Sequence, residues 1–215
     1  MSSKENSLNP YHNNHQHSVL LYNDTRNRDT YIINYINEGL NKNELCIYGT
    51  INLRDKESLE IAPHLIDYEK NISESNLMIV DLAPFYIAAL TRNMELFEKL
   101  KKEISERIKS RKNKHIRFVG DCASFLFENR HFAQCISIES WWNHRPIKGT
   151  YLCPYKKSIF KKYPFNLHKD NVIRANHDIV IDVGSNLSKK LMDDKREENS
   201  STERAIEKMR KEREI

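Results

Sequence analysis

The stretch HSVLLYNDTRNRDT, residues 17–30, predicts the first structural unit of the fold. Its apolar start, residues 17–22, is typical of a buried strand, and Asp24 or Thr25 in the polar turn is suited to cap a following helix. Large apolar residues then recur at close to a helical period, at Tyr31, Ile32, Tyr35, Ile36 and Leu40. Gly39 should weaken the last turn of that helix. The stretch therefore predicts a strand followed by a helix.

The same alternation continues along the chain. Apolar or β-branched runs typical of strands lie at 44–51, 76–83, 115–121, 149–155 and 177–184, with Pro154 ending the fifth strand of the series. Helical patterns separate them, the longest over roughly 92–112. Such alternation predicts an α/β fold, a three-layer sandwich with a mostly parallel central sheet and helices on both faces.

Composition divides the 215 residues into three parts. Residues 1–16 are rich in Asn, Ser and His and predict a disordered arm. Residues 17–184 form the folded body. Residues 185–215 are crowded with charges of both signs and predict a helical or disordered tail.

Composition also narrows the class of protein. No apolar run approaches the roughly 20 residues that span a bilayer, and the N-terminus has no apolar leader, so we expect a cytoplasmic protein with no membrane partner. The four cysteines, Cys46, Cys122, Cys135 and Cys153, form no CxxC pair, which excludes a zinc ribbon and predicts reduced, buried thiols. Basic segments at 95–117 and 155–169 favour solvated faces over a nucleic-acid surface.

Nucleotide binding is the obvious hypothesis for such a sheet, but the phosphate-binding glycines are absent. A P-loop needs GxxxxGK[ST] after the first strand, whereas the turn after residues 17–22 contains no glycine. Asp81 follows the strand at 76–83 and resembles a magnesium-binding carboxylate, but without a P-loop a strand-end cap is the favoured interpretation. We expect no bound cofactor and no ATP hydrolysis.

The histidines do not predict a metal site. His12, His15 and His17 lie close together, in or beside a polar arm where adventitious metal binding is favoured over a designed site. His168 and His177 flank an apolar turn, and a structural role is favoured for each.

The carboxyl ends of the strands offer a candidate pocket, because ligands of open α/β sheets bind there. These ends carry Tyr22, Asp24, Tyr48, Asp81, Asp121, Cys153 and Tyr155, and the segment ESWWN at 139–143 is expected nearby. His17 belongs to the opposite strand end and is expected to lie outside this pocket.

The ordered set HSVLLY, IRFVGD, IESWWN, YLCPY and a late LHxxxVI resembles the MEDS domain, a sensory domain of methanogens and methylotrophs. The resemblance covers about 17–175. It implies a RecA/KaiC-like core without the Walker A loop, and sensing of small organic molecules, such as hydrocarbon derivatives, rather than turnover.

The resemblance also implies site positions. The family's motifs fall on His17 and Tyr22, on Arg117, Gly120 and Asp121, on Glu139 and Asn143, on Cys153, Pro154 and Tyr155, and on His168. The family often has Glu where this chain has Asp121.

Two classes of function follow from these observations. The first is a non-catalytic sensory domain that binds a small organic ligand and signals through an unidentified protein partner or a change of homo-oligomer. The alternative is a degenerate nucleotide-binding protein or an enzyme that uses Asp81, Asp121 and Glu139.

Overall fold

The computed structural model describes residues 15–53, 61–144, 147–162, 176–183 and 190–191. One seven-stranded sheet organises them, with the strand order β3-β2-β4-β5-β1-β6-β7. The strands are β1 (His15–Tyr22), β2 (Leu45–Thr50), β3 (Leu77–Asp81), β4 (Ile116–Gly120), β5 (Gly149–Lys156), β6 (Ile179–Val183) and β7 (Lys190–Leu191). All neighbours pair in parallel except β6 and β7.

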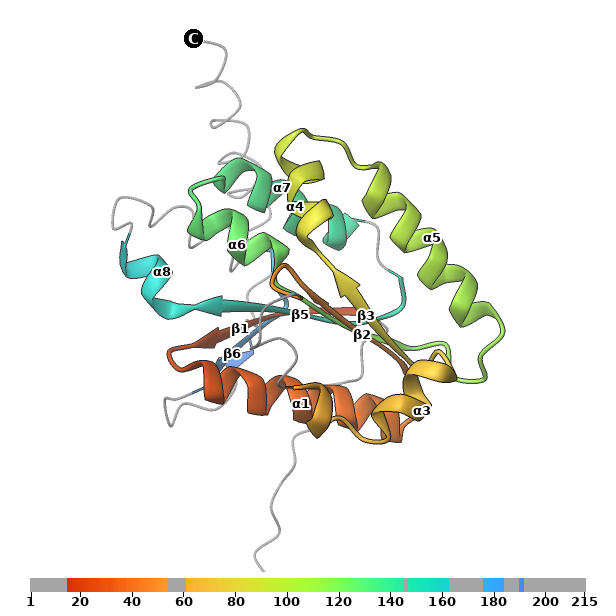
Figure 1. The fold of residues 1–215 in the computed structure, drawn as a ribbon. Helices are drawn as coiled ribbons and strands as arrows, with labels where there is room; N and C mark the ends of the chain where they lie inside the picture. Colours follow the sequence, from red (N-terminus) through yellow and green to blue (C-terminus); the bar gives the residue numbers. More distant parts are fainter. Residues whose placement is uncertain (1–14, 54–60, 145–146, 163–175, 184–189, 192–215) are drawn as a thin grey trace, which may run out of the picture.

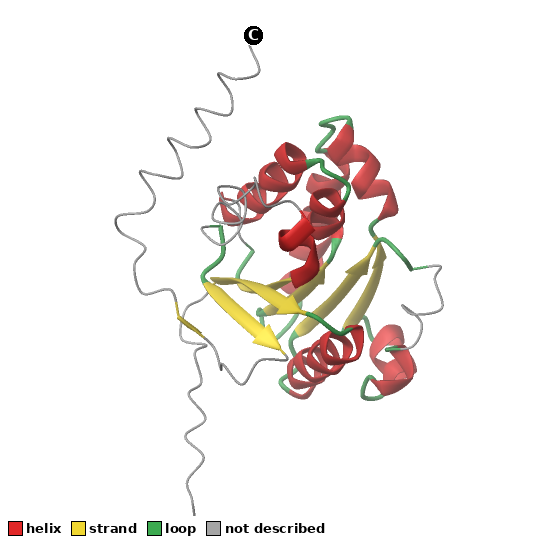
Figure 2. Cartoon of the chain, turned by 90° about the vertical axis from the view of Figure 1, so that its left-hand side faces the viewer, coloured by secondary structure: helices red, strands yellow, loops and turns green. Residues whose placement is uncertain are grey.

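Helices cover both faces of the sheet. One face carries α1 (Thr25–Asn41) and α3 (Tyr68–Ser73), and the other carries α4 (Ala83–Leu90), α5 (Glu95–Lys109), α6 (Cys122–Glu128) and α7 (Phe132–His144), as Figures 1 and 2 show. A short 3₁₀ helix, η1 (Ala62–His64), precedes α3, and α8 (Lys157–Lys162) follows β5. The predicted three-layer α/β fold with a mostly parallel sheet is confirmed.

Two apolar cores lie on the two faces of the sheet. Val19 packs into the core beneath α4–α7, whereas its neighbour Leu20 packs into the core on the α1 side. This alternation follows from the two-residue period of a strand. The continuous apolar runs of the sequence are therefore explained by burial on both faces.

The predicted caps of two helices are present. Asp24 accepts a hydrogen bond of 2.8 Å from the backbone N–H of Arg26 and so caps α1. Asp81 accepts one of 2.9 Å from the backbone N–H of Ala83 at the start of α4, as expected for a strand-end cap. Asp24 thus places a carboxylate at the start of the helix that follows the first strand, which is where a P-loop protein binds phosphate.

One expectation about a strand end was wrong. β5 continues through Pro154 to Lys156. The pairing of β5 with β4 stops at Leu152, so Pro154 stands where β5 has lost one neighbour, and a missing N–H is tolerated at such an edge. In the tail, Lys190 and Leu191 pair with β6 as the short strand β7.

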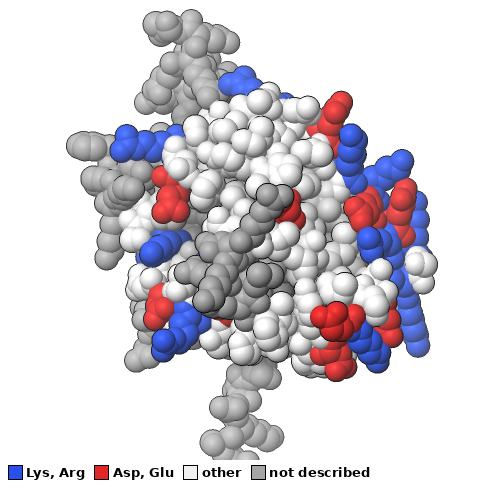
Figure 3. All heavy atoms as spheres, in the orientation of Figure 1, with Lys and Arg blue, Asp and Glu red and all other residues white. Residues whose placement is uncertain are grey.

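The cysteines and the charged side chains lie where the sequence predicts them. All four cysteines are free and buried, as predicted. Lys and Arg side chains lie among Asp and Glu along the edge of the molecule where α5 runs (Figure 3). Among the described residues, no helix has the length and apolar character needed to cross a membrane.

Candidate functional site

A group of five buried polar side chains lies between the sheet and α7. They come from β1, α7, β5 and the residues just before β6, and none exposes more than 8% of its surface. We name this group the polar cluster: His17, Glu139, Cys153, Tyr155 and His177. Burial of so many polar groups in one place requires that they satisfy one another.

Strand register brings the members from β1 and β5 together. Val19 lies opposite Cys153 and His17 lies opposite Tyr151 in the parallel pair. Side chains two residues apart share a face, so His17, Cys153 and Tyr155 all point toward α7. The expectation that His17 would lie away from Cys153 was wrong, because the ring Nε2 is 3.2 Å from the Cys153 Sγ. Two residues span only about 7 Å of strand, and the imidazole reaches across much of it.

Glu139 is the centre of the polar cluster. Its Oε2 lies 3.2 Å from His17 Nε2 and 3.4 Å from His177 Nε2. The Cys153 Sγ is 3.5 Å from the same oxygen. The other carboxylate oxygen, Oε1, accepts a hydrogen bond of 2.5 Å from the Tyr155 hydroxyl. One carboxylate therefore links β1, β5 and the segment just before β6 to α7.

Contacts of the Nδ1 atom orient the imidazole ring of His17. Its Nδ1 lies 3.0 Å from the backbone carbonyl of Asn176 and 3.2 Å from Asn143 Oδ1. Asn143 follows Glu139 by one turn of α7 and donates a hydrogen bond of 2.6 Å to the same Asn176 carbonyl. A proton on Nδ1 satisfies that carbonyl, which turns Nε2 toward Glu139 and Cys153.

Burial and the neighbouring histidines determine the protonation states. Burial opposes ionisation of Glu139, but the adjacent His177 and the contact with His17 hold its pKa well below the usual range. Burial and the charge of Glu139 raise the pKa of the Cys153 thiol well above its usual value. Burial, together with Cys135 and Glu139, does the same for the Tyr155 phenol. Cys153 is therefore a poor nucleophile as it stands, because nucleophilic attack requires a thiolate.

A small cavity of about 30 Å³ adjoins the polar cluster. His17, Glu139 and Cys153 form its polar wall, and the remaining wall is mostly aromatic and aliphatic, including Phe85, Phe97, Leu100, Phe118 and Trp142. A void of this size holds about one to three non-hydrogen atoms. The arrangement suits a very small molecule with one polar or polarisable end.

Asp121 and Tyr22 belong to a different place, the carboxyl edge of the sheet. Asp121 accepts hydrogen bonds of 2.6 Å from Thr50 Oγ1 and 2.9 Å from the backbone N–H of Ile51. Burial raises the pKa of Asp121, partly offset by these two donors. Nearby, the guanidinium of Arg28 lies 5.4 Å from the centre of the Tyr22 ring and contacts Asp29. The single pocket expected from the sequence thus separates into two groups of side chains.

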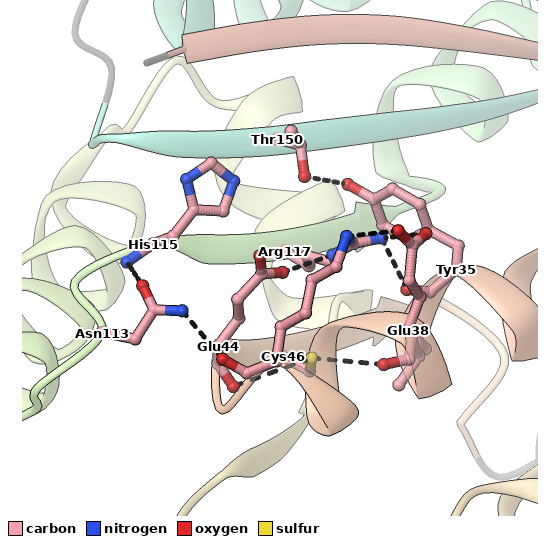
Figure 4. Close-up of polar contacts among 10 residues, drawn as sticks. Tyr35, Glu38, Glu44, Cys46, Asn113, His115, Arg117 and Thr150 are labelled. Atoms are coloured by element: carbon pink, nitrogen blue, oxygen red, sulfur yellow. Dashed lines mark hydrogen bonds and ion pairs between the residues drawn. The ribbon is translucent and has the colours of Figure 1, made fainter. Parts of the chain in front are cut away.

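Arg117 lies on the opposite face, against α1. Its guanidinium donates to Glu44, to Glu38 Oε2 at 3.1 Å and to the Tyr35 carbonyl at 3.0 Å (Figure 4). Burial disfavours its charge, but these glutamates raise the pKa of Arg117. The residue therefore joins α1 to the sheet and does not contact the polar cluster.

The structure brings together five of the residues proposed from the sequence: His17, Glu139, Asn143, Cys153 and Tyr155. His168 lies outside the described residues. His177, taken from the sequence as structural, and Asn176 both join the site. Their position at the start of the predicted strand at 177–184 was the available signal, but the pairing of β6 with β1 was needed to interpret it.

These observations define an α/β domain without a phosphate loop, whose polar residues converge beneath one helix. Residues 16–166 match the family model for the MEthanogen/methylotroph, DcmR Sensory domain. The chain belongs to this MEDS family, and membership indicates a sensory role.

The crystal structure of the flagellar accessory protein FlaH from Methanocaldococcus jannaschii is similar, with 11% identity and a TM-score of 0.43, over 78% of this chain and 70% of that chain. The comparison with curated proteins gave no match.

Proposed function

We propose that this chain is a non-catalytic sensory domain that binds a small organic molecule, such as a hydrocarbon derivative, in the cavity beneath α7. The observation that carries the proposal is the cavity itself, with apolar walls and one polar wall made by His17, Glu139 and Cys153. Binding sites for small molecules combine mostly apolar linings with a few placed polar groups. The family description supports a sensory role.

The signal leaves the domain through a protein partner or a change of oligomer. A ligand in the cavity would contact α7 at Glu139 and Trp142 and also the strands behind it. Because α6 and α7 pack on the same face, a small shift of α7 on binding would be felt at the surface that α6 and α7 form.

The alternative, an enzyme or degenerate nucleotide-binding protein, has less support. Asp81 caps α4, and Asp121 is held by Thr50 and Ile51. Glu139 contacts neither of them in the hydrogen bonds that define the polar cluster. Three carboxylates with separate partners do not make a shared metal or phosphate site.

Thermal unfolding of the full chain tests the proposal. Dichloromethane and methanol serve as probes of halogenated and one-carbon organics, and ATP with Mg²⁺ serves as the competing probe. A molecule present at ten times its Kd stabilises the folded state by about 1.4 kcal/mol, which corresponds to a rise in Tm of roughly 3–6 °C for a chain of this size. We expect such a rise with at least one small organic and none with micromolar ATP.

Two variants locate the binding. Ala123→Leu fills the cavity that Ala123 lines and should abolish the rise, whereas Asp121→Asn alters the carboxyl edge and should leave it unchanged. The unliganded Tm of each variant shows whether it has folded. A rise that survives Ala123→Leu but disappears in Asp121→Asn would place the ligand at the carboxyl edge and refute the cavity as its site. Micromolar binding of ATP would favour the alternative.

A further inference from the structure

Four members of the polar cluster present metal-binding atoms to one another. Their ligand atoms all lie within 4.8 Å, and they come from His17, Glu139, Cys153 and His177. We name them the four-ligand set. Successive members of the set are at least 14 positions apart in the chain, so only the fold assembles them. They come from the strands β1 and β5, the helix α7 and the segment just before β6.

Four of the six spacings among these atoms are close to the edges of a tetrahedral metal site, and the other two are within 4.8 Å. Zinc binds nitrogen and oxygen at about 2.0–2.2 Å and sulfur at about 2.3 Å, so the edges of a tetrahedral site measure about 3.3–3.6 Å. The Glu139 Oε2 lies 3.2, 3.4 and 3.5 Å from His17 Nε2, His177 Nε2 and Cys153 Sγ. The His17 Nε2 is also 3.2 Å from Cys153 Sγ.

The groups behind the ligands are those of a metal centre. Histidines that bind metals usually donate the other ring N–H to a carbonyl or carboxylate. The His17 Nδ1 has such a partner in the Asn176 carbonyl at 3.0 Å. The Tyr155 hydroxyl occupies Glu139 Oε1, which leaves Oε2 facing the other ligands. Hydrogen bonds within the protein therefore already orient His17 and Glu139 for metal binding.

Charge balance favours a divalent ion in so buried a place. A thiolate and a carboxylate together carry two negative charges, and two neutral imidazoles carry none. A divalent metal makes the sum zero, as burial away from water requires. A site with one sulfur and two imidazoles suits Zn²⁺ and similar transition metals rather than Mg²⁺ or Ca²⁺.

We propose that the four-ligand set binds one divalent transition metal ion of the Zn²⁺ type, with the Cys153 proton released to solvent as the sulfur–metal bond forms. The inference goes beyond the proposed function, since it requires no organic ligand. It also departs from the sequence expectation of no metal site. With four protein ligands the site is of the closed, structural kind, and it connects α7 to the strands β1 and β5 and to the segment just before β6.

The test uses the full chain, stripped with a chelator and then titrated. Zn²⁺ affinity is measured by competition with a chromophoric chelator, and Co²⁺ serves as the spectroscopic probe. We expect one ion per chain, visible absorption typical of tetrahedral Co²⁺, and a near-ultraviolet band from sulfur-to-cobalt charge transfer.

Matched variants assign the ligands. Cys153→Ser should remove the charge-transfer band and weaken Zn²⁺ binding at least 100-fold, whereas Cys46→Ser, in a buried cysteine on the other face of the sheet, should change neither. Tyr155→Phe should weaken Zn²⁺ binding by about 10- to 100-fold, as loss of a supporting hydrogen bond does. His12→Gln with His15→Gln removes the histidines of the arm and should leave one ion per chain.

X-ray absorption of the zinc-loaded wild-type chain requires no variant to fold. One sulfur and three nitrogen or oxygen neighbours are expected. Failure of the folded chain to bind one ion, an absence of sulfur around the metal, or a charge-transfer band that persists in Cys153→Ser would each overturn the proposal. No organic molecule is present in these measurements, so their result is separate from that of the thermal-shift test.

Discussion

Asp121 was expected in the ligand pocket, and in the structure it bonds to the end of a neighbouring strand. The Asp121 carboxylate accepts hydrogen bonds from Thr50 and Ile51 at the end of the neighbouring strand β2. These two donors favour the ionised form, yet burial prevails and raises the pKa of Asp121. A carboxylate so placed stabilises the local turn and also carries a cost at neutral pH.

The raised pKa of Asp121 predicts that the stability of the protein depends on pH. An acid whose pKa is raised on folding binds its proton more tightly in the folded state. Its contribution to stability is therefore fully present below its unfolded pKa of about 3.9 and is lost as the pH rises through the folded value. The free energy of unfolding of the wild type minus that of Asp121→Asn should fall as the pH is raised from 4 to 7.

Urea denaturation at a series of pH values measures this difference. Glu106→Gln, at an exposed position of α5, controls for the loss of one negative charge and should show no comparable trend. A difference that rises with pH would contradict the prediction.

The helix α1 illustrates a conflict between local preference and packing. From the sequence, Gly39 was expected only to weaken the last turn. In the structure a Cβ at this position would lie 2.6 Å from both Arg117 Cδ and Cys46 Sγ. The glycine therefore lets α1 lie close to the strands β2 and β4, where Arg117 donates to Glu44 and to the Tyr35 carbonyl.

Gly39→Ala should consequently destabilise the protein. Alanine is favoured over glycine inside a helix by about 1 kcal/mol, but overpacking of a buried contact costs about 1–3 kcal/mol, and the displaced side chain here is a buried arginine with fixed partners. We expect a net loss of about 1–2 kcal/mol in the free energy of unfolding, measured by urea denaturation. Asn34→Ala, at an exposed site on the same helix, should instead gain about 0.5 kcal/mol. A stabilised Gly39→Ala variant would show that the side chains of Arg117 and Cys46 move away at little energetic cost.

At the scale of the whole molecule, the two faces of the sheet carry different polar groups. The face toward α1 has the ion pairs of Arg117 with Glu38 and Glu44. The face toward α7 has the polar cluster and the cavity. The first joins a helix to the sheet, and the second is the candidate site. Substitutions in the Arg117 ion pairs are therefore expected to leave ligand binding at the polar cluster unchanged, and the reverse.

The tail should contribute little to the stability of this assembly. The only pairing described for it is that of Lys190 and Leu191 with two residues of β6. A chain that ends at Ser185 loses this pairing, and we expect a fall in Tm of no more than about 4 °C, which corresponds to about 1 kcal/mol for a chain of this size. Thermal unfolding followed by circular dichroism measures the change. A larger fall, or precipitation of the shortened chain, would show that the tail packs on the body or between subunits.

Local pattern was sufficient for the fold. The apolar runs of the sequence predicted six strands, and each one is present within a few residues of its expected bounds. Capping by Asp24 and Asp81 was also predictable, because a cap involves residues only two positions away. Such features depend on neighbours in the chain, so periodicity and residue type determine them.

The candidate site could be predicted only in part, because its contacts join distant parts of the chain. His17 and Glu139 meet across 122 positions, and His17 reaches Asn176 across 159. Periodicity places a side chain on a face, but it does not say which strands are neighbours. The order β5-β1-β6 places Cys153, His17 and His177 side by side. Asp121, which follows β4, instead bonds to Thr50 and Ile51 at the end of β2. Strand order depends on how whole elements bury their surfaces against one another, so only the tertiary structure decided which of the predicted residues share a site.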